Sequence, residues 1–160
     1  MSKVLIQSHL GESRLFDPPA SFQEQANMDA DKLKQAYEAA ADNPEAYWAN
    51  AAKDIVWHKE WHKTLDWSES PHAKWFIGGQ LNATESCLDR HLDTARAEKN
   101  ALVWESEGGD VRTYTYRQLH QEVCQLSNVL KAQGIEKGDR IAIYMPMVPE
   151  IVVAMLACAR

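Results

Sequence analysis

The first helical pattern begins near residue 29, where apolar side chains recur every three or four positions. Its apolar members are Leu33, Ala36, Tyr37 and Ala40. Asp29 or Asp31 is available as the N-cap of this helix. A second helix is predicted from Asn43 as N-cap and Pro44 as first helical residue, because proline suits that position. The apolar face of the second helix would consist of Tyr47, Trp48, Ala51 and Ile55.

A hairpin followed by a helix is predicted further along the chain. Two strand-like segments, 101–105 and 111–115, flank a turn that contains a Gly-Gly pair. Thr115 and Gln118 then have the spacing of a capping box, which pairs free backbone N–H groups at the start of a helix. We expect this helix to end at Gly134. Its apolar face carries Leu119, Val123, Leu126 and Leu130.

The last part of the chain predicts a strand and a buried helix. Residues 141–145 are apolar without alternation, which is typical of a strand covered on both faces in a parallel sheet. The helix expected over 148–160 is apolar nearly all round, so it should be buried on most sides. Helix, strand and helix in this order predict the opening of an α/β layered domain. We therefore expect this chain to be the N-terminal piece of a larger protein.

The remaining segments have weaker patterns. Residues 1–28 are predicted to form an irregular arm, because a Pro-Pro pair interrupts regular structure there. Residues 56–75 fit neither helical nor strand spacing and are rich in tryptophan, whose large rings usually anchor a segment by packing. A short strand with a Gly-Gly turn is expected over 74–82, and a short helix over about 84–93.

Composition and charge exclude several classes of protein. The 160 residues are 45% hydrophobic, which is typical of a globular chain. The net charge of −6 argues against a non-specific nucleic-acid binder, which needs a basic surface. The apolar run at 4–6 is too short for a signal peptide, and the longest run, 151–159, is too short to span a membrane. Three widely spaced cysteines favour reduced thiols in a cytoplasmic protein.

Two histidine-containing pairs have the four-residue spacing that could support chemistry on a helix. His58 and His62 would share a helix face, but Lys59 stands where a zinc-protease motif needs Glu, and no third ligand has suitable spacing. We interpret both as surface histidines. Cys87 and His91 would also lie on one helix, where a thiol and an imidazole can form a nucleophile. A free cysteine more often packs as a small apolar residue, which is the preferred interpretation.

The glycine pairs and the aromatic segment carry no recognised chemistry. The pairs at 78–79 and 108–109 do not form a phosphate-binding loop, so we interpret them as turn residues. The rings between Trp48 and Trp75 could stack nucleic-acid bases, but they lack flanking basic residues, and packing is preferred.

The basic residues near the end of the chain are interpreted structurally. Lys137, Arg140 and Arg160 are expected to be surface or domain-edge charges, and Arg160 could also face a downstream site. The sequence therefore predicts no catalytic, no cofactor-binding and no metal-binding residue within this chain.

Several segments in succession resemble the N-terminal region of AMP-forming acetyl-CoA synthetases. The likeness covers the chain from about residue 12 onward. It is carried by Glu12–Pro19, Lys74–Asn82, Cys87–His91, Tyr116–Cys124, Lys137–Glu150 and Ala154–Arg160. Two positions depart from the family pattern: Ser86 stands where Asn is usual, and Val56 where Asp often precedes the tryptophan.

The resemblance implies a mixed α/β fold in which residues 29–92 form a helical, Trp-rich cap and residues 93–160 begin the AMP-binding large domain. It implies a ligase that uses acetate, ATP, coenzyme A and Mg²⁺, with no nucleic acid and no membrane as partner. The family's phosphate loop, adenine pocket and catalytic lysine lie downstream of the position that matches Arg160. The resemblance therefore implies that this chain alone binds none of these cofactors and is inactive without the downstream large domain.

Two alternatives remain open at this point. A propionyl-CoA synthetase is similar in the same segments, and the acid-binding pocket that distinguishes the two lies outside this chain. A stand-alone, non-catalytic module would explain the lack of a catalytic set. Such a module would expose the apolar runs near its end, which soluble monomers avoid unless a partner covers them.

Overall fold

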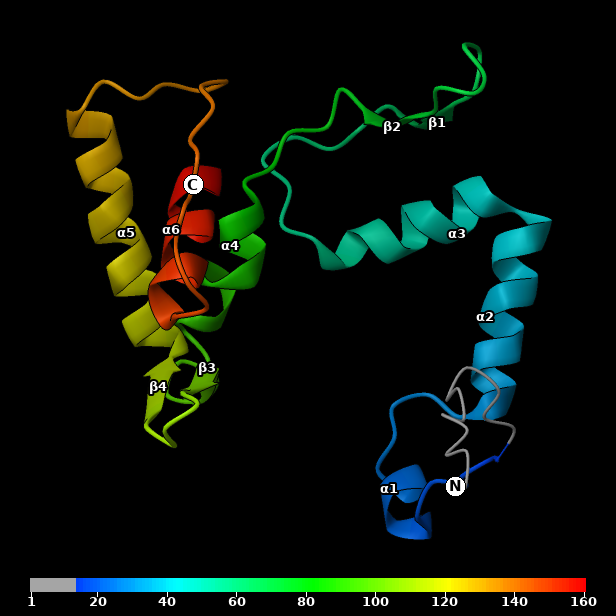
Figure 1. Ribbon diagram of the computed structural model, residues 1–160. Helices are drawn as coiled ribbons and strands as arrows, with labels where there is room; N and C mark the ends of the chain where they lie inside the picture. The colour runs from blue at the N-terminus through cyan, green and yellow to red at the C-terminus, as the bar shows by residue number, and fades with distance from the viewer. Residues whose placement is uncertain (1–13) are drawn as a thin grey trace, which may run out of the picture. The chain divides into compact units, whose positions relative to one another are not determined.

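The computed structural model describes residues 14–160 and divides the chain into two compact units, Met1–Pro44 and Glu45–Arg160 (Figure 1). The apolar run at 4–6 and the first part of the predicted arm lie outside the described residues. No helix among the described residues is long and apolar enough to cross a membrane.

The described part of the first unit, from residue 14 onward, contains two helices. α1 (Ala20–Glu24) lies within the predicted irregular arm, so that prediction is wrong for these residues. Pro19 has an extended backbone, and its carbonyl accepts hydrogen bonds from the N–H groups of Phe22 and Gln23. A proline just before a helix does not interfere with the helix, because its missing N–H would have no partner there. α2 (Ala30–Asp42) is confirmed, with Asp29 as its N-cap.

The second unit includes a short hairpin that the sequence predicted only in part. α3 (Pro44–Ala51) begins at Pro44 as predicted and ends before Ile55, and η2 (Ala52–Asp54) follows it. β2 (Lys74–Ile77) confirms the predicted strand. β1 (Lys63–Asp66), antiparallel to β2, lies in the segment for which no regular structure was predicted. Four residues are too few to show an alternating pattern, and pairing with β2 supplies the missing hydrogen bonds.

The helix expected over about 84–93 is divided into two pieces. α4 (Ala83–Cys87) and η3 (Asp89–His91) are separated by Leu88, whose φ of −123° and ψ of −63° are not helical. Leu88 is fully buried, so the change of direction places a large apolar side chain in the core.

The central hairpin and its helix are confirmed. β3 (Asn100–Glu105) pairs antiparallel with β4 (Val111–Thr115), and α5 (Tyr116–Ala132) follows directly. Both hydrogen bonds of the predicted capping box are present between Thr115 and Gln118. Gly134 has a φ of +83°, which suits a glycine just after the end of a helix.

The predicted strand over 141–145 is not formed within the described chain. A strand needs hydrogen bonds to a neighbouring strand, and the described sheets contain only the β1–β2 and β3–β4 pairs. No parallel sheet is present in the part of the chain that the structure describes. The segment is held at its end by the Trp104 indole N–H, which donates to the Met147 carbonyl oxygen at 2.7 Å.

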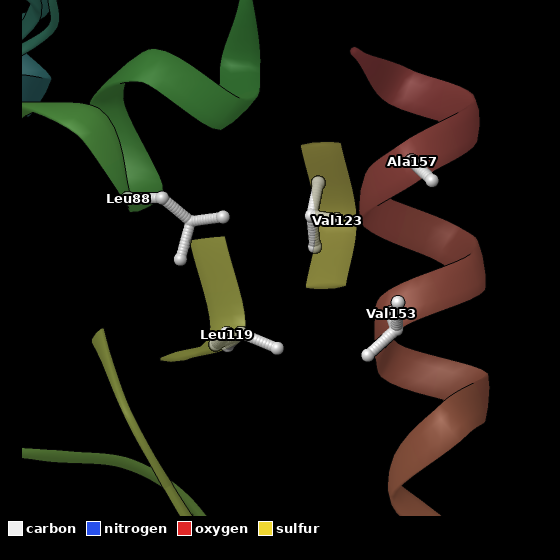
Figure 2. Close-up of a cluster of buried hydrophobic side chains, with 5 residues drawn as sticks. All are labelled: Leu88, Leu119, Val123, Val153 and Ala157. Atoms are coloured by element: carbon white, nitrogen blue, oxygen red, sulfur yellow. The ribbon is translucent and has the colours of Figure 1, made fainter. Parts of the chain in front are cut away.

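The core lies between α4, α5 and α6 (Pro149–Ala159), with α5 and α6 side by side (Figure 1). Figure 2 shows the buried side chains that form it, which are Leu88, Leu119, Val123, Val153 and Ala157. Only one side of α6 is buried, since Val153 is 8% exposed but Met155 is 59% exposed. The expectation that α6 is buried on most sides is therefore not met within the described residues.

Candidate functional site

A charged pair joins the end of α6 to the start of η3. The Arg160 guanidinium donates from Nη1 to Asp89 Oδ2 and from Nη2 to Asp89 Oδ1, both at 2.8 Å. Two parallel N–H···O bonds are the strongest geometry for this kind of pair. The two residues are 71 positions apart in sequence, so the pair links two segments that only the tertiary structure brings together.

Arg160 also binds the residues that begin α4. Its Nη1 donates to Thr84 Oγ1 at 3.1 Å, and its backbone carbonyl accepts from Asn82 Nδ2 at 3.1 Å. The Asn82 side chain in turn accepts from the backbone N–H of Thr84, which is the N-cap bond of α4. Thr84 is fully buried, and its hydroxyl is satisfied by these neighbours. Asn82 therefore connects the start of α4 to the end of α6.

The pair is electrostatically favourable despite its partial burial. Hydrogen bonds from Arg160 hold the pKa of the Asp89 carboxyl below its usual value, and the positive charge of Arg160 acts in the same direction. The same hydrogen bonds raise the pKa of Arg160. Both effects exceed the opposing cost of desolvation, so both groups are charged at neutral pH.

The helix α5 adds an imidazole and a thiol to this pair. His120 Nε2 lies 3.3 Å from Asp89 Oδ1, and Cys124 Sγ lies 3.4 Å from His120 Nε2 and 3.9 Å from His120 Nδ1. His120 and Cys124 are four positions apart, which places them on one face of the helix. We call Asp89, His120, Cys124 and Arg160 the Asp89 cluster. It brings together a carboxylate, an imidazole, a thiol and a guanidinium from three elements.

Local sequence patterns do not predict this cluster, although they carry one signal of it. The histidine and cysteine of the cluster have the same four-residue spacing as the pair Cys87 and His91, within a helix that the capping box had already predicted. No local pattern connects them to Asp89 or Arg160, which approach only through tertiary packing. Arg160 itself was expected at a surface or domain edge, and the structure instead turns its side chain inward to Asp89.

The predicted pair of Cys87 and His91 is not formed. The helix breaks between them at Leu88, so they do not share a helix face. Cys87 is exposed, and the His91 ring packs edge-on against Tyr116 with centroids 4.9 Å apart. Partial burial of the His91 imidazole lowers its pKa, with smaller contributions from two nearby arginines.

His58 and His62 do not share a helix face either, because their segment is extended. The N–H of His58 donates to the Gln80 carbonyl, and its ring Nε2 lies 2.7 Å from Glu85 Oε2. The His62 ring lies so close to Gly78 that a Cβ there would be 2.5 Å from its Nδ1. Within residues 14–160, no three His, Cys, Asp or Glu side chains are placed to hold a metal ion.

The aromatic segment packs against itself. The rings of Trp57, Trp61 and Phe76 contact one another with centroids 4.9–5.6 Å apart. The Trp57 indole N–H donates to the Ala52 carbonyl at 2.8 Å, so its polar group is satisfied. Gly79 packs against the same ring, because a Cβ there would be 2.6 Å from Trp57 Cζ3. These contacts support the interpretation as packing anchors for these three rings. Trp48, Trp67 and Trp75 are exposed, and the interpretation does not hold for Trp67, which is 55% exposed.

The two positions that depart from the family pattern contact each other. The backbone N–H of Val56 donates to Ser86 Oγ at 3.0 Å, across 30 residues of sequence. The hydroxyl of Ser86 thus connects the segment after η2 to α4, and the Val56 side chain takes no part in the bond.

A hollow of about 1080 Å³ lies beside Arg160, between the C-terminal parts of α5 and α6 and the loop that joins them. Its apolar lining includes Leu130, Ile141, Ile143 and Met155. Lys137 also lines it, as one of the exposed basic residues that the sequence predicted, whereas Arg140 is exposed outside it.

Comparison with known proteins identifies the family. The profile described as acetyl-coenzyme A synthetase N-terminus matches residues 33–87, and the profile described as AMP-binding enzyme matches residues 88–160. The chain belongs to the acetyl-coenzyme A synthetase family. The two matches are adjacent, and Arg160 binds residues on both sides of the boundary, since Thr84 precedes it and Asp89 follows it.

Individual members of the acetyl-coenzyme A synthetase family align with nearly the whole chain. The acetyl-coenzyme A synthetase of Ralstonia pickettii is 48% identical over 157 residues, and that of Streptomyces coelicolor is 46% identical over 160 residues. The aligned regions are 97% and 100% of this chain, but only 24% of each relative. The chain therefore spans about a quarter of the length of these curated relatives.

A solved structure of an acyl-CoA synthetase has a similar fold. Acetoacetyl-CoA synthetase from Streptomyces lividans matches with a TM-score of 0.69 and 28% identity, covering 76% of this chain and 19% of that protein. This match supports the mixed α/β fold expected from the sequence.

Proposed function

We propose that the protein that carries this segment is an AMP-forming acetate–CoA ligase. The observation that supports the proposal is the 43–48% identity to proteins named acetyl-coenzyme A synthetase over nearly the whole chain. In the proposed reaction, an acetate oxygen attacks the α-phosphorus of ATP, which forms acetyl-adenylate and releases pyrophosphate. The thiol of coenzyme A then attacks the acetyl carbonyl, which forms acetyl-CoA and releases AMP. Positioning and charge neutralisation on the phosphates are what such a reaction requires.

The residues of this chain have structural roles in the proposal. The described residues contain no three-ligand metal cluster, and the sequence has no phosphate-binding loop. We propose that the sites for ATP and Mg²⁺ lie outside these residues, and we assign no reaction step to them. We propose that residues 29–92 form the cap and that residues 93–160 begin the large domain. In this proposal the Asp89 cluster holds these two parts together. We also propose that the enzyme is cytoplasmic.

The segment 141–145 is part of the same proposal. Ile141 and Ile143 are half-buried and face the hollow, while Tyr144 is fully exposed and the segment has no strand partner in the described chain. We propose that in the large domain this segment is a strand and α6 is the crossover helix that leads to the next parallel strand. A right-handed crossover of this kind is the rule in α/β sheets.

A pyrophosphate-release assay on the whole protein tests the proposed activity. With ATP, Mg²⁺ and coenzyme A present, we expect release that depends on acetate and exceeds the rate with propionate. A preference for propionate would change the substrate and keep the reaction, whereas no release with either acid would overturn the proposal.

The separately expressed segment 1–160 provides the second arm of this assay. We expect no turnover from it, because the residues that bind ATP are proposed to lie elsewhere in the protein. Sustained turnover by the segment would contradict the structural role assigned to these residues.

A further inference from the structure

We draw no further inference here: the strongest candidate, the partly apolar hollow beside Arg160 between the C-terminal parts of α5 and α6 and the loop that joins them, belongs to the segment 141–145 already assigned to the large domain, and nothing in the part of the chain that the structure describes shows what fills it.

Discussion

Two helices of this chain, α2 and α5, have similar local signals and different surroundings. Each begins at a side-chain cap, Asp29 for α2 and Thr115 for α5, and each carries apolar residues at helical spacing. In α5 the apolar face is buried, with Val123 at 0% exposure. In α2 no residue is buried, and Tyr37 is 71% exposed. Within its own unit, the apolar face of α5 is covered by neighbouring elements, whereas the described elements of the first unit do not cover that of α2.

The comparison separates the formation of a helix from its burial. Caps and periodicity act within a few residues, so they predict both helices equally well. Burial depends on elements that are distant in sequence: α5 packs against α6 and contributes to a core that also contains Leu88 of the α4–η3 segment. Most helical stability in proteins comes from packing of this kind. The two helices should therefore respond differently to the same substitution.

Leucine-to-alanine substitutions give the largest expected difference. Leu119 is 4% exposed and lies in the core, so Leu119→Ala should lower the free energy of unfolding by about 3 kcal/mol, through lost burial and a cavity. Leu33 on α2 is 45% exposed, and Leu33→Ala should cost less than about 1 kcal/mol. Thermal and urea unfolding of the whole protein measure both. Equal costs would show that another part of the folded protein covers the apolar face of α2.

The next largest effect is expected at the pair that closes the region around α5. Asp89→Asn keeps the size of the side chain but removes the charge that binds Arg160, and should cost about 2 kcal/mol, a typical value for hydrogen bonds to charged groups. Asp31→Asn in the first turn of α2 is the control, and should have little effect on unfolding. If Asp89→Asn lowered the free energy of unfolding no more than Asp31→Asn does, the result would show that the Asp89–Arg160 pair does not stabilise the contact between α6 and η3.

Acid should remove the contribution of Asp89. The pKa of its carboxyl is lowered in the folded protein from an ordinary value of 3.8, mainly by hydrogen bonds from Arg160. A lowered folded pKa stabilises the protein at pH values above 3.8, and this stability is lost as the pH falls through the folded pKa. The difference in melting temperature between wild type and Asp89→Asn should therefore be largest near neutral pH and shrink below 3.8. A difference that stays constant down to pH 2.5 would contradict this assignment.

The smallest effect is expected at the helix caps, where the two helices should resemble each other. Thr115→Ala removes one half of the capping box and should cost about 1 kcal/mol. Asp29→Ala removes the bond to the Lys32 N–H, which has a length of 2.8 Å. We expect it to speed hydrogen exchange in the first turn of α2 and to leave the unfolding of the α5 region unchanged. If Asp29→Ala also lowered the protection from hydrogen exchange around α5, the result would show that the two regions unfold together.

The candidate site illustrates the limits of sequence patterns in the same way. The spacing of His120 and Cys124 on a predicted helix could have been noted from the sequence. Asp89 could not be placed beside them, because the helix expected over 84–93 breaks at Leu88 and a buried leucine gives no signal for a break. Conversely, the pairs His58 and His62, and Cys87 and His91, have helical spacing, but their backbones are not continuous helices.

The sequence by itself determined the short-range features of this protein. They include the caps at Asp29 and Thr115, the β3–β4 hairpin, the turn at Gly134 and, through successive motifs, the acetyl-coenzyme A synthetase family. Each depends on side chains and backbone groups a few residues apart. The tertiary structure alone decided that β1 pairs with β2, that only one side of α6 is buried, and that Arg160 meets Asp89 across 71 residues. Those outcomes depend on which distant segments supply hydrogen bonds, charge and apolar surface, and local patterns do not encode that information.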